Sequence, residues 1–216
     1  MSTYICFLLI KKNWSHIDDQ LLKLLPIIRR IKTEKYYHDS DKFLSLYSTL
    51  LLSYMLEDYY HIDNALHNIV WENNKKPILK GFPNIDFSYS HTKGAILCGI
   101  TKNSSIGVDI ELANTPPYEI MPLVFHPNEI CYVNNSLRSK KQAFYKIWTQ
   151  KEAFTKRKGT GLSGDIISID TQALQSTPLK TWTQNKYICS ISQDNFSKIN
   201  YLDISLSQII EHYLQT

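Results

Sequence analysis

The sequence contains little glycine, little arginine and no hydrophobic run long enough to cross a membrane. The chain has 216 residues, enough for one domain or two small ones with a buried core. The apolar run Tyr4–Ile10 is too short to span a bilayer, and two lysines follow it instead of preceding it. We therefore expect neither a signal peptide nor a membrane anchor. Arginine accounts for 4 of the 24 basic residues, which argues against sequence-specific DNA binding because bidentate arginines read guanine.

The four cysteines also exclude two classes of small protein. They stand at positions 6, 98, 131 and 189, with no Cys-x-x-Cys pair and no histidine at zinc-finger spacing. This scatter predicts neither a disulfide framework nor a structural zinc site. Buried thiols in a reducing cytoplasm fit this cysteine pattern best. Because 43% of the residues are hydrophobic and 20% are charged, we expect a globular, soluble protein.

Hydrophobic periodicity divides the chain into two units separated by a polar joint at residues 102–105. The first unit predicts strands at 4–10, 69–71, 77–79, 85–90 and 95–101, a helical segment at 18–31 broken at Pro26, and a helix at 41–60. The second unit predicts a strand at 107–112, helices at 127–134 and 140–158, and strands near Ile166, Tyr187 and Tyr201.

Two carboxylates share one predicted strand in the second unit. After Gly107, the aliphatic residues Val108 and Ile110 alternate with Asp109 and Glu111, so both acids project from one face with their Cα atoms about 6.5–7 Å apart. Acids this close repel each other unless a cation bridges them or one is protonated. Their oxygens suit Mg²⁺, and we expect Asp109 to be exposed in a cleft. An ordinary solvent-facing strand is the alternative interpretation.

The end of the predicted helix at 140–158 places charged groups at the border of an apolar arc. Glu152 lies one turn after Trp148, with Lys156 a further turn along, and Gly159 ends the helix. This arrangement suits a cleft, although a surface Glu-Lys pair would give the same pattern. Lys151 falls in the middle of the arc, so it must extend to solvent or find an anion.

Candidate phosphate ligands occur in the first unit. Ser90 and His91 stand at the end of a predicted strand just before Gly94, where backbone N–H groups and side chains can converge on phosphate oxygens. Arg29, Arg30, Lys32 and Lys35 could bind another phosphate. A hydrogen-bonded turn histidine and a solvated helix end are the respective alternatives.

The stretch from Arg138 to Lys158 holds eight basic residues against one acidic residue, Glu152. Such an excess favours a phosphate-bearing or acidic partner, because long-range attraction raises the local concentration of anions. A solvated helix face is the alternative interpretation of the same run.

Taken in order, three motifs resemble the 4′-phosphopantetheinyl transferase superfamily. They are Ser90-His91, then Gly107-Val108-Asp109-Ile110-Glu111, then Trp148-Thr149-Gln150-Lys151-Glu152-Ala153 with Lys156 and Gly159-Thr160-Gly161-Leu162. The resemblance covers about residues 25–165 and extends more weakly to Lys32, Tyr36-Tyr37-His38, Asp41 and Lys76-Pro77. Length and the position of the joint place the chain with the surfactin-type members. Two departures are Ser88, where relatives usually have Asn, and Leu44, where many carry Arg.

The resemblance implies an α+β fold made of a pseudo-twofold pair of similar subdomains. Each subdomain would be a small antiparallel sheet packed on helices, with the active site in the cleft between them. Residues 1–105 would form the N-terminal half with the phosphate-binding groups. Residues 106–216 would form the C-terminal half with the metal-binding and catalytic carboxylates and the carrier-protein dock.

The activity that the resemblance implies is transfer of the phosphopantetheine arm of coenzyme A to a serine of an acyl or peptidyl carrier protein, which releases adenosine 3′,5′-bisphosphate. Asp109, Glu111 and Glu152 would hold Mg²⁺, and Glu152 or a metal-bound water would take the serine proton. Lys156 would neutralise the leaving phosphate. The remaining coenzyme A ligands would be Arg29, Lys32, Ser45, Lys76, Ser90 and His91. Such chemistry rests on positioning and charge neutralisation.

The partners follow from the same resemblance. We expect coenzyme A and a carrier protein, no nucleic acid, no membrane and a monomeric state, and we expect the carrier to dock on the apolar connector 112–135. Two other classes stay open: a non-catalytic binder of coenzyme A or another nucleotide, and a single-stranded nucleic-acid protein that stacks bases on its 14 tyrosines. The acids Asp109, Glu111 and Glu152 oppose both, because acidic clusters repel phosphate unless a metal lies between.

Overall fold

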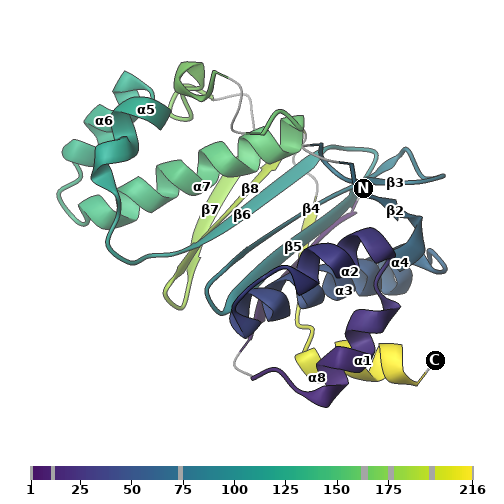
Figure 1. Ribbon diagram of the computed structural model, residues 1–216. Helices are drawn as coiled ribbons and strands as arrows, with labels where there is room; N and C mark the ends of the chain where they lie inside the picture. The colour runs from purple at the N-terminus through teal and green to yellow at the C-terminus, as the bar shows by residue number, and fades with distance from the viewer. Residues whose placement is uncertain are drawn as a thin grey trace.

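Two main sheets, mostly antiparallel and with helices on their outer faces, and one small two-stranded sheet make up the described part of the protein (Figure 1). The computed structural model describes residues 2–10, 13–72, 75–161, 165–174, 178–194 and 198–215. The predicted mixed α+β class is confirmed.

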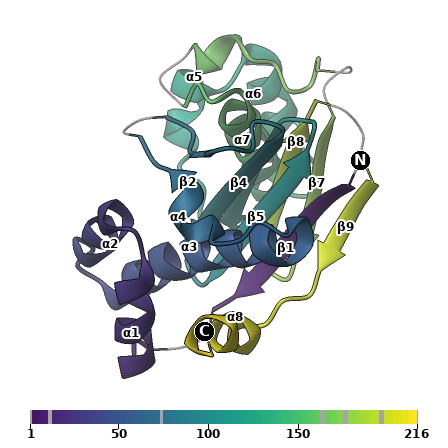
Figure 2. The same cartoon turned by 90° about the vertical axis from the view of Figure 1, so that its right-hand side faces the viewer.

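The first sheet has the strand order β4-β5-β1-β9. Its strands are β1 (Ser2–Leu9), β4 (Ile85–Thr92), β5 (Ala95–Lys102) and β9 (Lys198–Leu202). The 22-residue helix α3 (Asp39–Tyr60) packs on β4 and β5, and α1 (His16–Leu24), α2 (Ile27–Glu34), α4 (Ala65–Asn68) and α8 (Leu206–Leu214) lie around α3 (Figure 2). In the described ranges, no helix is both long and apolar enough to cross a membrane. A short hairpin of β2 (Ile69–Val70) and β3 (Ile78–Leu79) lies beside β4.

The second sheet has the order β6-β8-β7, with one long helix across it. Its strands are β6 (Ile106–Leu112), β7 (Leu179–Gln184) and β8 (Tyr187–Gln193), and the helix is α7 (Lys140–Lys158). The shorter helices η1 (Tyr118–Ile120), α5 (Met121–Val124), α6 (Pro127–Asn134) and η2 (Ile166–Ser168) complete this part. A Cβ atom on Gly107 would lie 1.9 Å from the carbonyl oxygen of Ala153. Glycine is therefore required where α7 crosses β6.

The two sheets meet through both their inner faces and their edges. Between the faces, Ile5 and Leu97 pack with Val108 and Ile110 in a single apolar cluster. At the edge, β4 and β6 are joined by side chains: the Val108 amide donates to Ser88 Oγ at 3.0 Å. This places the polar side chains at the end of β4 directly beside those of β6.

The predicted elements in the region of the three motifs are confirmed, including the bounds of α6 and α7. The strand expected near Ile166 is wrong, because that residue begins the 3-10 helix η2. Helix α8 and strand β7 were not expected. The division at residues 105 and 106 stays a prediction, and the structure adds that β9 pairs in parallel with β1, so the end of the chain packs on the first sheet.

Candidate active site

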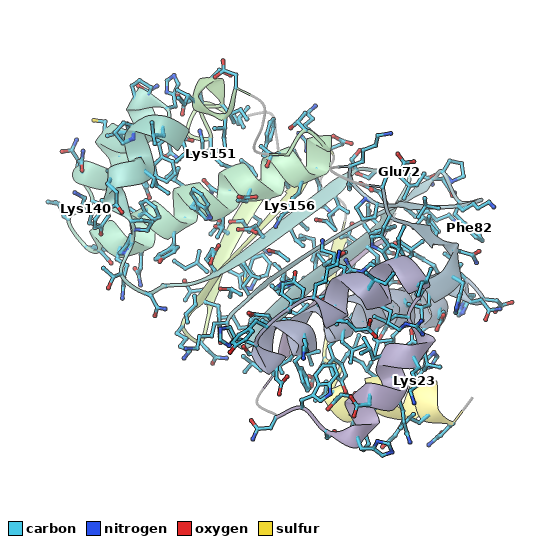
Figure 3. All side chains as sticks on the ribbon, in the orientation of Figure 1. Lys23, Glu72, Phe82, Lys140, Lys151 and Lys156 are labelled. Carbon is cyan, nitrogen blue, oxygen red and sulfur yellow. The ribbon has the colours of Figure 1, made fainter. Side chains whose placement is uncertain are left out.

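The ammonium group of Lys156, a residue of α7 (Figure 3), contacts side chains from both main sheets. It donates to Asp109 Oδ1 at 2.6 Å and to Ser90 Oγ at 2.9 Å. Ser90 in turn donates to the same Asp109 oxygen at 2.7 Å. Three motifs that are far apart in the sequence therefore meet on α7, β4 and β6. Burial opposes the charge of Lys156, but attraction to Asp109 and Glu152 outweighs it, so the pKa of Lys156 is raised.

Asp109 is buried, in contrast to the expectation that it would be exposed in a cleft. It is 3% exposed because α7 covers the polar face of β6, an approach that Gly107 permits. Among the described residues, Asp109 Oδ2 has no hydrogen-bond partner although it is buried. An ionised oxygen in this position is costly unless a positive charge or a donor reaches it.

Glu111 and Glu152 lie within the electrostatic influence of Asp109. Burial and repulsion by Asp109 raise the pKa of Glu111 to about 7, against hydrogen bonds from Thr92 and Trp148. Burial also raises the pKa of Glu152, which Lys156 lowers and Asp109 raises. We call these three carboxylates the acid side of the site. Its negative charges are crowded, and that crowding favours a cation.

The donor set of the acid side fits a magnesium ion in chemistry. Within the described parts of the chain, no group of three His, Cys, Asp or Glu side chains is gathered closely enough to hold a metal. Mg²⁺, however, commonly uses one or two carboxylates and completes its shell with phosphate and water. The free oxygen of Asp109 and the raised pKa of Glu111 both mark a deficit of positive charge.

A second cluster, on α2 and α3, contains a buried positive charge without a negative partner among the described residues. Arg29 is 4% exposed and donates to Thr49 Oγ1 at 2.9 and 3.2 Å and to Ser45 Oγ at 3.5 Å. Its guanidinium lies 5.5 Å from the centre of the Trp71 ring. No ion pair joins Arg29 to a carboxylate in the described ranges. A buried cation held only by neutral groups favours an anionic ligand.

His91 connects this cluster to Lys156. Its Nδ1 lies 3.3 Å from Ser48 Oγ, and burial together with the positive charges of Lys156, Arg29 and Lys32 lowers the pKa of His91 to about 4. Burial and Arg29 also lower the pKa of Lys32. We call Arg29, Lys32, Ser45 and His91 the anion side of the site. His91 is neutral at pH 7, yet it lies where several cations converge.

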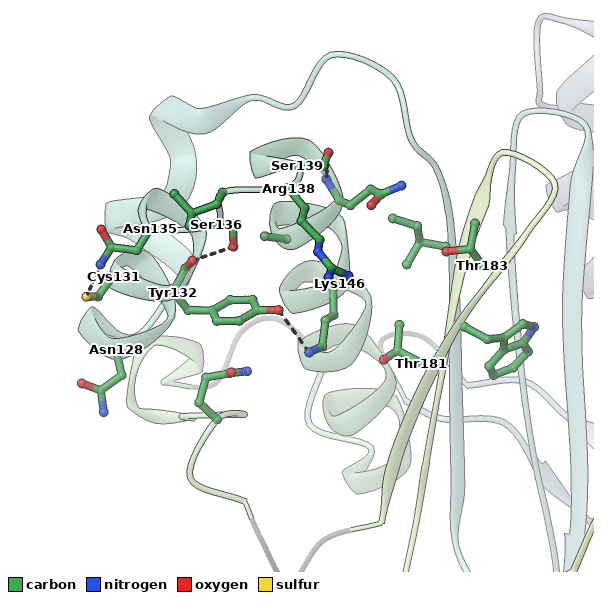
Figure 4. Close-up of a pocket in the computed structure, with 16 residues that line it drawn as sticks. Asn128, Cys131, Tyr132, Asn135, Ser136, Arg138, Ser139, Lys146, Thr181 and Thr183 are labelled. Carbon is green, nitrogen blue, oxygen red and sulfur yellow. Dashed lines mark hydrogen bonds between the residues drawn. The ribbon is translucent and has the colours of Figure 1, made fainter.

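One of the cavities beside α7 adjoins the site. A cavity of about 300 Å³ is lined by Tyr89, Lys156, Gly159, Gly161 and neighbouring residues. The larger groove, about 950 Å³, lies toward the other end of α7 between α6 and β7 (Figure 4). That groove contains none of the predicted site residues. Leu162 and Gly164 of the glycine-rich motif lie outside the described residues.

Comparison with known proteins points to one superfamily. Residues 105–203, in the second half of the chain, match the model of the 4′-phosphopantetheinyl transferase superfamily. Asp109, Glu111, Glu152 and Lys156 all lie within the matched residues. It is 28% identical over 155 residues to the 4′-phosphopantetheinyl transferase ffp of Bacillus subtilis, covering 71% of this chain and 69% of the relative. It is 26% identical over 161 residues to the transferase Sfp of Bacillus subtilis strain 168 (73% and 70%), and 29% identical over 196 residues to the transferase gsp of Aneurinibacillus migulanus (82% and 79%).

The structure separates the superfamily positions predicted from sequence into three groups. Ser90, Asp109 and Lys156 are in direct contact. Charges couple Glu111 and Glu152 to them, and Arg29, Lys32, Ser45 and His91 form the anion side. Lys76 stands apart: its ammonium donates to Asp86 at 2.5 Å and to the Ile106 carbonyl at 2.8 Å.

The two departures from the superfamily pattern have structural roles here. Ser88 supplies the hydroxyl that accepts the Val108 amide at the junction of β4 and β6. Leu44 is 5% exposed and belongs to the core beneath α3. An arginine at that position would have to leave this core or reorganise it.

Sequence reasoning missed the partner of Lys151. This lysine is 1% exposed, and its ammonium donates to Glu129 Oε2 at 2.6 Å and to the Ile169 carbonyl. Glu129 also accepts from the backbone and hydroxyl of Thr171. We expected Lys151 either to extend to solvent or to find an anion, and the structure shows the anion. The sequence signal that could have drawn attention to Glu129 is its place as the third residue of α6, after His126 and Pro127.

Proposed function

We propose that this protein transfers the 4′-phosphopantetheine arm of coenzyme A to a serine hydroxyl of an acyl or peptidyl carrier protein. The superfamily match over residues 105–203 and the names of the relatives support this activity. The observation that carries the proposal is the contact of Lys156 with both Asp109 and Ser90. It puts a cation, a carboxylate and a hydroxyl from three elements at one point between the acid side and the anion side.

The transfer exchanges one phosphorus–oxygen bond for another. The serine oxygen attacks the phosphorus that carries the pantetheine arm, the bond to the neighbouring phosphate oxygen breaks, and adenosine 3′,5′-bisphosphate leaves with that electron pair. Glu152 takes the serine proton, a role helped by burial, which raises the pKa of Glu152. Lys156 donates hydrogen bonds to the departing phosphate and neutralises its charge.

Asp109, Glu111 and Glu152 would hold Mg²⁺ in this proposal. Asp109 Oδ2 is the first candidate to bind the metal, because it is buried and has no hydrogen-bond partner among the described residues. When bound, the metal would withdraw negative charge from the pyrophosphate oxygens. It would also relieve the repulsion between Asp109 and Glu111 that raises the pKa of Glu111.

The anion side would bind the other phosphate of coenzyme A. Arg29 and Lys32 supply positive charge, and Ser45 and His91, together with the neighbouring Ser90, supply hydrogen-bonding groups at the wall formed by α2, α3 and β4. Lys76 keeps its ammonium on Asp86, so its contribution would come from the part of its side chain that lines the cavity beside Lys156.

The finer architecture belongs to the same proposal. Each half would be one subdomain of a pseudo-twofold pair, residues 1–105 and 106–216, with the site in the cleft between them. The support is a repeated arrangement, because α3 packs on β4 and β5 much as α7 packs on β6 and β8. We also propose a cytoplasmic monomer without nucleic-acid or membrane partners.

The test is Mg²⁺-dependent mass gain of an apo carrier protein incubated with coenzyme A. We expect the carrier to gain the mass of one phosphopantetheine in the presence of Mg²⁺, and to gain none when a chelator is added or when its acceptor serine is replaced by alanine. Binding of coenzyme A without mass gain on any carrier in a panel from fatty-acid, polyketide and peptide synthesis would contradict the activity. That result would leave a non-catalytic nucleotide binder.

A further inference from the structure

A further cavity lies beside the polar joint at residues 102–105. Its volume is about 630 Å³, and its lining comes from the hairpin β2–β3, the turn between β3 and β4, the start of β4, the joint and the end of α7. We call it the joint cavity. It shares one lining residue, Lys76, with the cavity beside the active site. The proposed function uses no other residue of this lining to bind substrate, so the joint cavity is available for a different ligand.

Arg157 brings a buried positive charge to the joint cavity. Its side chain is 5% exposed, and its guanidinium lies 5.1 Å from the centre of the Phe154 ring. Within the described parts of the chain, its hydrogen bonds come from Nη1 alone, to the Gln193 carbonyl at 3.1 Å and to Asp194. Nε is buried and has no partner there. The edge formed by Nε and Nη2 therefore lacks the acceptor that a buried guanidinium requires.

The hydroxyl of Ser104 is a second polar group of the lining without a partner. Its Oγ is buried and makes no hydrogen bond to any residue that the structure describes. The backbone that follows is engaged, because Asp194 accepts the Ser105 amide at 3.0 Å and Asp86 accepts the Ile106 amide at 2.8 Å. Most buried polar groups in proteins have a partner. Two unpartnered groups beside one cavity therefore indicate a ligand that carries acceptor atoms.

The charged residues of the lining favour an anion. The lining contains three cationic side chains and one acidic side chain: Lys76, Lys80 and Arg157 against Asp86. Asp86 already accepts hydrogen bonds from the Lys76 ammonium and from the backbone. An anion in the cavity would balance the excess of positive charge. A carboxylate matches the Nε–Nη2 edge of an arginine, because its two oxygens accept two parallel hydrogen bonds from that edge.

The strand β3 and the turn after it give the joint cavity an apolar wall. Ile78 on β3 is 59% exposed, and Phe82 in the turn, labelled in Figure 3, is 36% exposed. Both line the cavity, together with Pro83. Ligand sites commonly combine apolar surface of this kind with a few polar groups that fix the orientation of the ligand. The joint cavity contains both parts.

We propose that the joint cavity binds a small carboxylate with an apolar body. The carboxylate accepts two hydrogen bonds from the Nε–Nη2 edge of Arg157 and one from the Ser104 hydroxyl, and the apolar body packs on Ile78 and Phe82. Arg157 directly follows Lys156 in α7, so this ligand binds beside the active site without using its catalytic groups. The proposal goes beyond the transferase function and does not depend on it.

The first test is calorimetry of the intact chain with hexanoate, hexan-1-ol and acetate. Hexan-1-ol lacks the carboxylate, and acetate lacks the apolar body. Hexanoate should therefore bind at least about tenfold more tightly than either. Hexyl phosphate, which has the same body and a different anionic group, should bind more weakly than hexanoate because its tetrahedral group fits the planar edge of Arg157 less well.

The second test locates the hexanoate site with variants of the polar groups. Arg157→Lys keeps the positive charge but loses the double donor edge, so hexanoate should bind about tenfold more weakly. Ser104→Ala removes no hydrogen bond between described residues. It should therefore be at least as stable as the wild type in urea and should bind hexanoate severalfold more weakly. The control is Arg138→Lys, an exposed arginine outside the cavity, which should leave the affinity unchanged.

A matched pair of isoleucines tests the apolar wall. Ile78→Thr keeps a β-branched residue on β3 and should weaken hexanoate binding severalfold, because apolar contact with the ligand is lost. Ile167→Thr changes an exposed isoleucine outside the cavity and should have no effect on the affinity.

Three results would overturn the proposal. If hexanoate binds no more tightly than hexan-1-ol or acetate, or if Arg157→Lys and Ser104→Ala both retain the wild-type affinity, ordered water satisfies these groups instead of a ligand. If hexyl phosphate binds more tightly than hexanoate, the carboxylate class is wrong. If Arg29→Gln abolishes hexanoate binding and Arg157→Lys does not, the hexanoate lies on the anion side. Failure to modify any carrier protein would contradict the transferase function and leave the joint cavity unaffected.

Discussion

The acid side and the anion side of the site are opposite in charge and alike in construction. On the anion side, Arg29 is buried among hydroxyls. On the acid side, Asp109 is buried with one oxygen free, and its neighbour Glu111 has a pKa raised to about 7. Each side holds charge that the described residues leave partly unbalanced. Because the unbalanced charges have opposite signs, the proposed function balances both: the phosphates of the substrate would neutralise the anion side, and a metal ion would neutralise the acid side.

Lys156 and Ser90 belong to neither side alone, since their contacts cross from α7 to β4 and β6. If the acid side holds the metal and the anion side binds a phosphate, substitutions on the acid side should affect the chemical step. Substitutions on the anion side should affect which nucleotide is bound. Substitutions outside both sides, and away from Lys156 and Ser90, should affect folding or carrier binding only.

The largest expected effect is that of Glu152→Gln, which preserves shape but removes the base. Turnover should fall by about 10²–10⁴-fold, while coenzyme A remains bound. The measurements are the rate of carrier modification by mass spectrometry and calorimetry with coenzyme A. Glu72→Gln, which breaks a surface pair with Lys75, serves as the control. Unchanged turnover in Glu152→Gln would contradict the catalytic role of Glu152 and leave it as one member of a surface Glu-Lys pair.

Two lysines of α7 should separate catalysis from stability. Lys156→Met should lower turnover by about 10²-fold or more, because the ammonium is offered to the leaving phosphate. Its loss of stability should be smaller than that of Lys151→Met, because the Lys156 side chain is 31% exposed. Lys151→Met leaves Glu129 buried without its partner, so the free energy of unfolding should fall by about 3–5 kcal/mol. Urea denaturation and turnover per folded molecule check both variants. Equal loss of turnover in the two would show that position on α7, not contact with the acid side, decides activity.

The anion side should distinguish coenzyme A from dephospho-coenzyme A. Each charged hydrogen bond to the 3′-phosphate contributes roughly 1.5–3 kcal/mol, so the wild type should bind coenzyme A at least about tenfold more tightly. The double variant Arg29→Gln with Lys32→Ala should lose most of this preference, while Lys35→Ala should keep it. Calorimetry with both ligands decides. Equal affinities in the wild type would place the 3′-phosphate elsewhere.

The smallest expected effect concerns stability at acid pH. The pKa of His91 is about 4 in the folded protein, against 6.5 ordinarily, so the unfolded chain binds more protons between these values. The free energy of unfolding should therefore fall as the pH drops from 6.5 to 4. His91→Gln should lose about 2 kcal/mol less over this range. Urea denaturation at pH 7 and 4.5 measures the difference, with exposed His67→Gln as control; identical curves for His91→Gln and the wild type would contradict it.

Local patterns predicted the elements that carry the site. The apolar arc and the glycine at position 159 predict where α7 begins and ends. The alternation of apolar and polar residues at 107–112 predicts strand β6. These signals depend on neighbours within a few residues, and so they are readable from sequence. The meeting of Ser90, Asp109 and Lys156 was available through resemblance and not through any pattern in the chain.

Long-range packing decided what sequence reasoning did not predict. The burial of Asp109 depends on how closely Ala153 approaches Gly107, and the orientation of Lys76 depends on Asp86. The strand β9 joins β1 across nearly the whole chain. In each case the partner is set by tertiary contacts, for which a local pattern holds no information.

The most direct test of the account is calorimetry of coenzyme A with and without Mg²⁺, on the wild type and on Asp109→Asn. We predict that Mg²⁺ strengthens coenzyme A binding to the wild type and has no effect on Asp109→Asn. Without Mg²⁺, adenosine 3′,5′-bisphosphate should bind both proteins about equally through the anion side. If Mg²⁺ strengthens binding to Asp109→Asn as much as to the wild type, the acid side is not the metal site and the account is wrong.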